Sequence, residues 1–71
     1  MIKYQIDFEC HWNSTYPVPM TCGTFYRRAN NMLDILIMLY QSWITLPWIL
    51  DYTFIISSET EFQVVSRKAI V

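Results

Sequence analysis

The N-terminal segment of the chain alternates between apolar and polar side chains at every position from residue 2 to residue 12. The apolar members are Ile2, Tyr4, Ile6, Phe8, Cys10 and Trp12, and the polar members are Lys3, Gln5, Asp7, Glu9 and His11. Successive side chains of a strand point to opposite faces, so a period of two indicates one buried face and one solvated face. The segment is therefore predicted to be a half-buried β-strand.

A second strand is expected from Met20 to about Arg28, after a turn at residues 13–19. Pro17 and Pro19 oppose regular pairing in this turn, and the Asn-Ser-Thr run before them favours it. If the hairpin places Cys10 opposite Cys22, one alternate set of the second strand shares the apolar face of the first strand. That set is Met20, Cys22, Thr24 and Tyr26. The other set, Thr21, Gly23, Phe25 and Arg27, is then expected to face outward beside Asp7, Glu9 and His11.

A helix is predicted to begin after Asn30 or Asn31 and to end at about Trp43 or Ile44. Either asparagine can cap the helix, and Asp34 in the first turn suits the positive end of the helix dipole. At about 100° per residue the apolar side chains fill an arc of roughly 200°, wider than the stripe that a helix buries against one sheet. The residues expected to pack on the sheet are Leu33, Leu36, Ile37 and Tyr40, against Ile6, Phe8, Phe54 and Val64.

Two more strands are expected in the C-terminal part of the chain. Pro47 ends any helical run, and residues 51–57 then carry Tyr52, Phe54 and Ile56 at alternate positions. After a polar turn at residues 58–60, a strand over residues 61–67 is predicted to point Phe62 and Val64 inward. The order ββαββ predicts a single α+β domain over residues 1–71, an antiparallel sheet of about four strands with one helix packed on it.

The composition adds a prediction about surfaces. Apolar residues make up 54% of the 71 residues, and charged residues make up 15%, against about 25% in an average domain. A chain this short buries only about 60% of the surface that its unfolded form exposes, so part of this apolar material is expected at the surface. An apolar patch of that kind is typical of a protein that binds a second copy of itself or another protein.

The interface candidates come from the part of the helix's apolar arc that the sheet is not expected to cover. One edge of the arc carries Met32, Ile35 and Leu39, and the C-terminal end of the helix carries Trp43 and Ile44, with Trp48 beyond it. The charged residues Asp7, Glu9, Arg27 and Arg28 are predicted to form the rim. The interface is expected to join two copies about a two-fold axis, or to hold a protein target.

Few residues suggest catalysis or metal binding. Cys10 and His11 are neighbours on a predicted strand and point to opposite faces, so they cannot bind one zinc ion together. The single glycine, Gly23, excludes a glycine-rich phosphate loop. No enzyme activity, metal site or cofactor is therefore predicted, and Cys10 and Cys22 are interpreted as buried free thiols.

Two other functions are weighed against a protein-binding role. Residues 25–28 combine two aromatic side chains with two arginines, which suits stacking on bases, but a net charge of −1 disfavours binding to nucleic acid. Residues 35–50 are uncharged, which suggests membrane association, yet they are fewer than the about 20 that a span needs, and Pro47 interrupts them. The N-terminus lacks a signal sequence, which favours a cytoplasmic location.

In general character the chain resembles the small accessory proteins of bacteriophages, which are short, rich in aromatic residues and without catalytic motifs. This resemblance implies a protein that binds and inhibits a host enzyme or defence complex, as anti-CRISPR proteins do, or that neutralises a toxin. We therefore expect a small, non-catalytic protein-interaction module, located in the host cytoplasm if the protein is viral.

Overall fold

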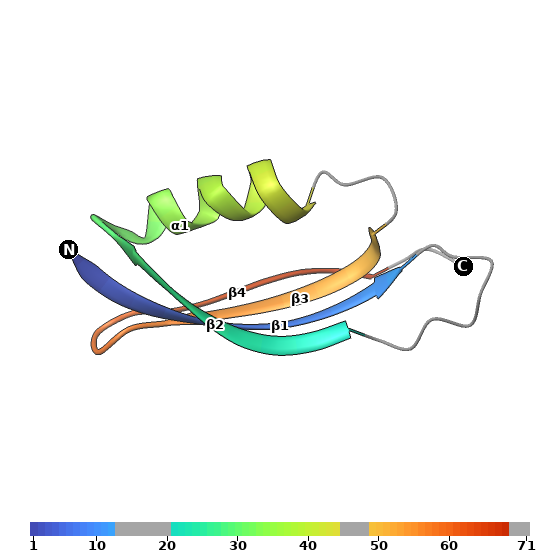
Figure 1. The fold of residues 1–71 in the computed structure, drawn as a ribbon, viewed down its shortest axis with the longest axis horizontal. Helices are drawn as coiled ribbons and strands as arrows, with labels where there is room; N and C mark the ends of the chain where they lie inside the picture. Colours follow the sequence, from blue (N-terminus) through green and yellow to red (C-terminus); the bar gives the residue numbers. More distant parts are fainter. Residues whose placement is uncertain (13–20, 45–48, 69–71) are drawn as a thin grey trace.

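The computed structural model describes residues 1–12, 21–44 and 49–68. The elements follow in the order β1 (Ile2–Trp12), β2 (Thr21–Ala29), α1 (Met32–Leu39), a π-helical turn η1 (Tyr40–Ile44), β3 (Ile49–Ser57) and β4 (Phe62–Arg67). Figure 1 shows α1 lying along one face of the sheet. The predicted α+β fold with the order ββαββ is confirmed. The predicted turn at residues 13–19, together with Met20, Pro47 and Trp48, lies outside the described residues.

The four strands form one antiparallel sheet in the order β2-β1-β3-β4. β1 and β3 occupy the centre, and β2 and β4 form the two edges. The connection between β3 and β4 is tied by Ser58, whose N–H donates to the carbonyl of Glu61 at 2.9 Å and whose hydroxyl accepts from the Glu61 N–H at 3.1 Å. This polar turn is the one that the sequence predicts, and it brings β4 back beside β3.

The alternation of β1 divides the sheet into two faces. Tyr4, Ile6 and Cys10 are buried on the face that α1 covers, which we call the inner face, and Phe8 is partly buried there. Asp7, Glu9 and His11 lie on the opposite, outer face. The half-buried character predicted for β1 is confirmed, because a polar residue at every second position leaves only one face that can be buried.

The predicted pairing of β1 with β2 is wrong by one residue. Ile6 lies opposite Phe25 and Cys10 lies opposite Thr21, rather than opposite Cys22. A shift of one residue exchanges the two faces of a strand, so Cys22 and Tyr26 lie on the outer face instead of the inner one. The observed register brings the Phe25 ring against Trp43, with ring centroids 5.9 Å apart.

Gly23 also lies on the inner face, at a position with little room for a side chain. A Cβ atom added at Gly23 would lie 3.0 Å from the Phe8 Cζ atom. The Phe8 ring therefore occupies the space over Gly23 and reaches Trp43, whose ring centroid is 5.2 Å away. In the predicted register this glycine would have faced outward.

The helix begins as predicted but presents a different face to the sheet. The Asn31 side chain caps it by accepting from the Asp34 N–H at 3.1 Å. Ile35 and Leu39, one helical turn apart, are fully buried. The turn η1 then follows, and because π-helical hydrogen bonds span five residues rather than four, Ile44 is brought back to the buried side.

The residues expected to anchor the helix are therefore largely on its outer side. Leu33, Ile37 and Tyr40 are exposed, whereas Leu36 is partly buried against the core. Of their expected partners in the sheet, Ile6 and Phe54 are fully buried. Among the side chains that the structure describes, the buried apolar ones are Tyr4, Ile6, Cys10, Ala29, Ile35, Leu39, Ile44, Tyr52, Phe54 and Ile56.

The orientation predicted for β4 is also wrong. Phe54, which faces inward, lies opposite Val65, so Val65 and its alternate neighbours belong to the inner face. Phe62 and Val64 point outward and are exposed. Three of the five residues at positions 62–66 are apolar, and neighbouring valines at 64 and 65 give no contrast between the two faces. Pairing with β3 decides the orientation instead.

Candidate functional site

The helix residues predicted to form an interface belong to the core. Ile35, Leu39 and Ile44 are buried, and Met32 and Trp43 are partly buried and packed against them. The three buried side chains are not available to a partner, so the prediction is corrected for them, whereas Met32 and Trp43 keep part of their surface exposed and their role stays a prediction. Trp48, the remaining candidate, lies outside the described residues.

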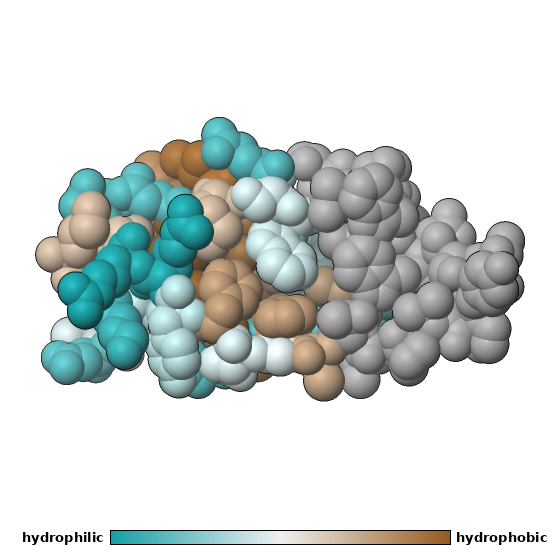
Figure 2. Space-filling view, viewed as in Figure 1, coloured by the Kyte–Doolittle hydropathy of each residue, from teal (hydrophilic) through white to brown (hydrophobic). Residues whose placement is uncertain are grey.

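A different set of apolar side chains is exposed on α1. Leu33 is 61% exposed, Ile37 is 44% exposed and Tyr40, at the start of η1, is 49% exposed. They are spaced by four and three residues, so they lie in one row on the helix surface. We call this row the helix stripe. Figure 2 shows apolar residues reaching the surface on the side of the molecule where α1 lies.

The helix stripe is held on a rigid support. Ile35 and Leu39, on the opposite side of the helix, are buried in the core. At the start of the helix, the Asn31 side chain accepts a hydrogen bond from the backbone N–H of Asp34. The side chains of Asp34, Gln41 and Ser42 near the stripe are polar, and all are exposed. The stripe is therefore an apolar row with polar neighbours, presented in a fixed geometry.

The four predicted rim residues do not surround the helix. Asp7 and Glu9 lie on the outer face of β1, away from α1. Arg28 lies opposite Lys3, also on the outer face, whereas Arg27 lies opposite Tyr4 and belongs to the inner side of the β2 edge. They form no common border around the helix stripe.

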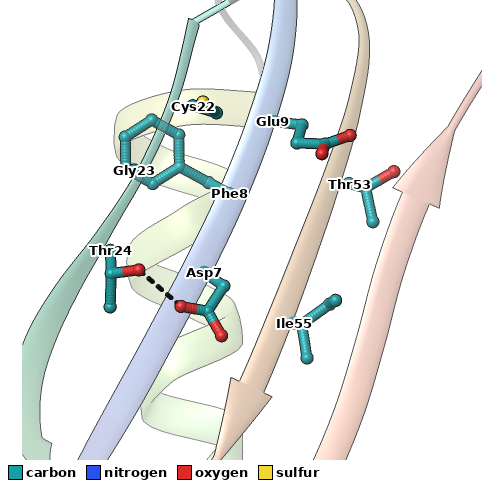
Figure 3. A pocket seen from close by; sticks show the side chains of 8 residues that line it. All are labelled: Asp7, Phe8, Glu9, Cys22, Gly23, Thr24, Thr53 and Ile55. Carbon is teal, nitrogen blue, oxygen red and sulfur yellow. Dashed lines mark hydrogen bonds between the residues drawn. The ribbon is translucent and has the colours of Figure 1, made fainter.

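The outer face of the sheet contains a shallow hollow of about 380 Å³ around Asp7. Figure 3 shows the Thr24 hydroxyl turned toward Asp7, to which it donates at 2.6 Å, with Glu9, Thr53 and Ile55 on the other side of the hollow. The Gln5 amide also donates to Asp7, at 3.2 and 3.3 Å. These contacts tie the Asp7 carboxylate into the surface of the sheet, as expected for a structural side chain.

The aromatic and basic residues at positions 25–28 are divided between the two faces. Phe25 packs against Phe8 and Trp43 on the inner face, while Tyr26 is exposed on the outer face. The Lys3 ammonium lies 4.8 Å from the centroid of the Tyr26 ring. Residues 25–28 therefore do not present two aromatic rings and two arginines on one surface.

Among the described residues, no group of three or more histidine, cysteine, aspartate and glutamate side chains is placed to hold a metal ion. Cys10 is on the inner face, and His11 is on the outer face, where its Nδ1 atom contacts the Asp51 carboxylate. Cys10 and Cys22 are free. Burial raises the pKa of the Cys10 thiol, and the nearby charge of Asp51 adds to this effect.

The prediction that both thiols are buried is correct for Cys10 and wrong for Cys22, which is exposed on the outer face. A thiol reagent such as Ellman's reagent is expected to modify Cys22 rapidly in the folded protein and Cys10 only after unfolding. The reason is that Cys22 is accessible, whereas Cys10 is inaccessible and burial raises the pKa of its thiol. In the control variant Cys22→Ser the rapid phase should disappear, and equal rates for both thiols would contradict the observed register.

Comparisons with protein-family models, with curated proteins and with solved structures each found no match to this chain. Within the described ranges, no helix has the length and apolar character required to cross a membrane.

Proposed function

We propose that this protein is a non-catalytic interaction module that binds another protein through the helix stripe of Leu33, Ile37 and Tyr40. The observation that carries the proposal is the exposure of these three side chains on a helix whose other side is buried in the core. Large apolar side chains grouped in this way are a feature of binding surfaces. This surface replaces the helix flank that the sequence suggested.

The spacing of the stripe suits one mode of recognition. Apolar anchors at positions i, i+4 and i+7 are typical of a helix that lies in an apolar groove of its partner. Since α1 is already folded and packed on the sheet, binding would not have to order it, which reduces the entropic cost of association. Asp34 lies beside the stripe and is exposed. The matching partner therefore has an apolar groove with a basic group at the end that receives Asp34.

The consequence proposed for the partner is inhibition. A rigid module of 71 residues that fills an apolar groove blocks whatever else binds there, such as a substrate or another subunit. The resemblance in general character to phage accessory proteins supports this role, with a host enzyme, a defence complex or a toxin as the class of target. Blocking by occupancy requires no chemistry from the bound protein.

The test introduces a charge into the stripe. A photoreactive amino acid at position 37 should crosslink one protein reproducibly in host cells, and that protein is then purified for binding measurements. Ile37→Glu is expected to weaken its binding at least about tenfold, because a carboxylate would be desolvated in an apolar groove. Isothermal titration calorimetry with the purified pair gives the dissociation constant.

The matched control is Gln41→Glu, which adds the same side chain at an exposed polar position of the following turn. It should leave both binding and the circular dichroism spectrum unchanged. Equal affinity of Ile37→Glu and wild type would reject the proposed surface. Binding to single-stranded RNA or DNA that weakens steeply between about 50 and 200 mM salt would instead favour the nucleic-acid function.

A further inference from the structure

The edge strand β4 has an unusual combination of exposure and composition. Among the described elements it pairs only with β3, so its other side has no neighbouring strand there; in this strand the Val64 carbonyl accepts from the Gln63 side chain at 3.3 Å. Residues 62–66 contain no charge and no proline, and the β3–β4 register has no bulge. Phe62 is 69% exposed and Val64 is 45% exposed on the outer face of this strand. A strand edge of this kind is a template for pairing with another strand.

The opposite edge, β2, is protected in a way that β4 is not. Arg27 and Arg28 project from neighbouring positions of β2, one on each side of the sheet. Charged side chains on an edge strand discourage pairing with a further strand, particularly one of the same charge. The two edges of the sheet are therefore not equivalent, and β4 is the edge open to pairing.

The charges at the two ends of β4 indicate which strand would pair with it. Glu59 and Glu61 precede the strand, and Arg67 and Lys68 end and follow it. In an antiparallel pair of two identical strands, the acidic end of each lies beside the basic end of the other. In a parallel pair, like charges would lie side by side. The β4 segment is thus complementary to itself in the antiparallel orientation.

We propose that two copies of this protein pair through β4 to form a continuous eight-stranded antiparallel sheet. A two-fold axis perpendicular to the sheet, passing between the two Val64 residues, keeps the outer faces of both copies on the same side. This register places Glu61 of one copy opposite Arg67 of the other and Phe62 opposite Ser66. The two Val64 side chains and the nearby Phe62 rings then cover one another.

The existing contact of Glu61 is compatible with this pairing. One carboxylate oxygen of Glu61 accepts from the Tyr4 hydroxyl at 2.9 Å, and a carboxylate has room for further donors on its other oxygen. The Cζ atom of Arg67 lies 5.1 Å from the centroid of the Tyr52 ring. Each dimer would also present two helix stripes on the same face, so it would be a bivalent form of the proposed binding module.

The experiment measures mass in solution over a wide concentration range. Pairing through one strand buries less than the about 1,600 Å² of a standard interface, so dissociation in the micromolar range is expected. Wild-type protein should therefore sediment at twice the chain mass of 8.5 kDa at high concentration and approach 8.5 kDa on dilution. Val64→Lys should raise the dissociation constant at least about tenfold while leaving the fold intact, because lysine is a natural residue of exposed edge strands.

The matched control is Cys22→Lys, the same substitution at an exposed position of the β2 edge, which should dimerise like wild type. A second measurement uses Val64→Cys in a Cys22→Ser background, in which mild oxidation should crosslink two copies faster than it crosslinks wild type through Cys22. A monomeric wild type at all concentrations, an unaffected Val64→Lys or a monomeric Cys22→Lys would each overturn the proposal. None of these results depends on the partner that the helix stripe binds.

Discussion

The variant Leu39→Asp is expected to be unfolded at 25 °C. Leu39 is fully buried between α1 and the sheet. Removing the leucine alone costs about 2–5 kcal/mol, and an unpaired carboxylate in the same place adds several more through desolvation. The total reaches or exceeds the about 5 kcal/mol that a domain of this size is expected to have. Far-ultraviolet circular dichroism and a two-dimensional NMR spectrum would show the loss of structure.

Leu33→Asp is the matched control, since it makes the same substitution in the same helix. Leu33 is among the most exposed apolar residues of α1, so its replacement should change the free energy of unfolding by less than about 1 kcal/mol. Urea titrations should be made at one protein concentration, because dimer formation would contribute to apparent stability. A folded Leu39→Asp together with an unfolded Leu33→Asp would show that the helix is oriented as the sequence suggested.

The sequence does not determine which side of α1 faces the sheet, because the helix is apolar over a wide arc. Both Leu33 and Leu39 lie within the apolar arc of roughly 200°, and a helix with so wide an arc can bury either side. Asn31 is one of the two predicted caps, whereas the α-helix ends at Leu39 and the predicted end at Trp43 or Ile44 falls in the π-helical turn η1. Which side of the helix is buried depends on how its side chains pack against the aromatic rings of the sheet, including Phe8 and Phe54. The periodicity of the sequence carries no information about this packing.

In the strands too, some features follow from the local sequence and others follow from contacts between distant residues. In β1 a polar residue at every second position leaves one possible inner face, so the buried set including Tyr4 and Ile6 is predicted correctly. In β4 apolar residues occur on both sides, and pairing of Val65 with Phe54 determines the orientation. The helix stripe and the exposed edge of β4 are therefore consequences of packing, and only the presence of surplus apolar surface follows from composition.

The register of β2 is the third feature that the sequence does not determine. The register of a hairpin depends on the length and type of its turn, and the sequence between β1 and β2 has more residues than a tight turn and contains two prolines. Phe25 and Tyr26 are both aromatic, so either could occupy the inner face. The deciding contacts are distant in sequence, because Phe25 stacks on Trp43 at an interplanar angle of 11°.

A pair of alanine substitutions tests this register directly. Phe25→Ala should lower the free energy of unfolding by about 2–3 kcal/mol, somewhat less than for a fully buried phenylalanine, because Phe25 is only partly buried. It removes ring contacts with Phe8 at 5.8 Å and with Trp43 at 5.9 Å. Tyr26→Ala removes an exposed ring and its contact with Lys3, and should cost less than about 1 kcal/mol.

Urea titrations of both variants, at matched protein concentration, give the two values. The comparison is internally controlled, because the residues are neighbours on one strand and both substitutions replace an aromatic residue by alanine, with a similar loss of strand propensity. In the register with Cys10 opposite Cys22, Tyr26 would lie inside and Phe25 outside, so the order of the two losses would be reversed. A larger loss for Tyr26→Ala would therefore contradict the observed pairing, and with it the exposure of Cys22 on the outer face.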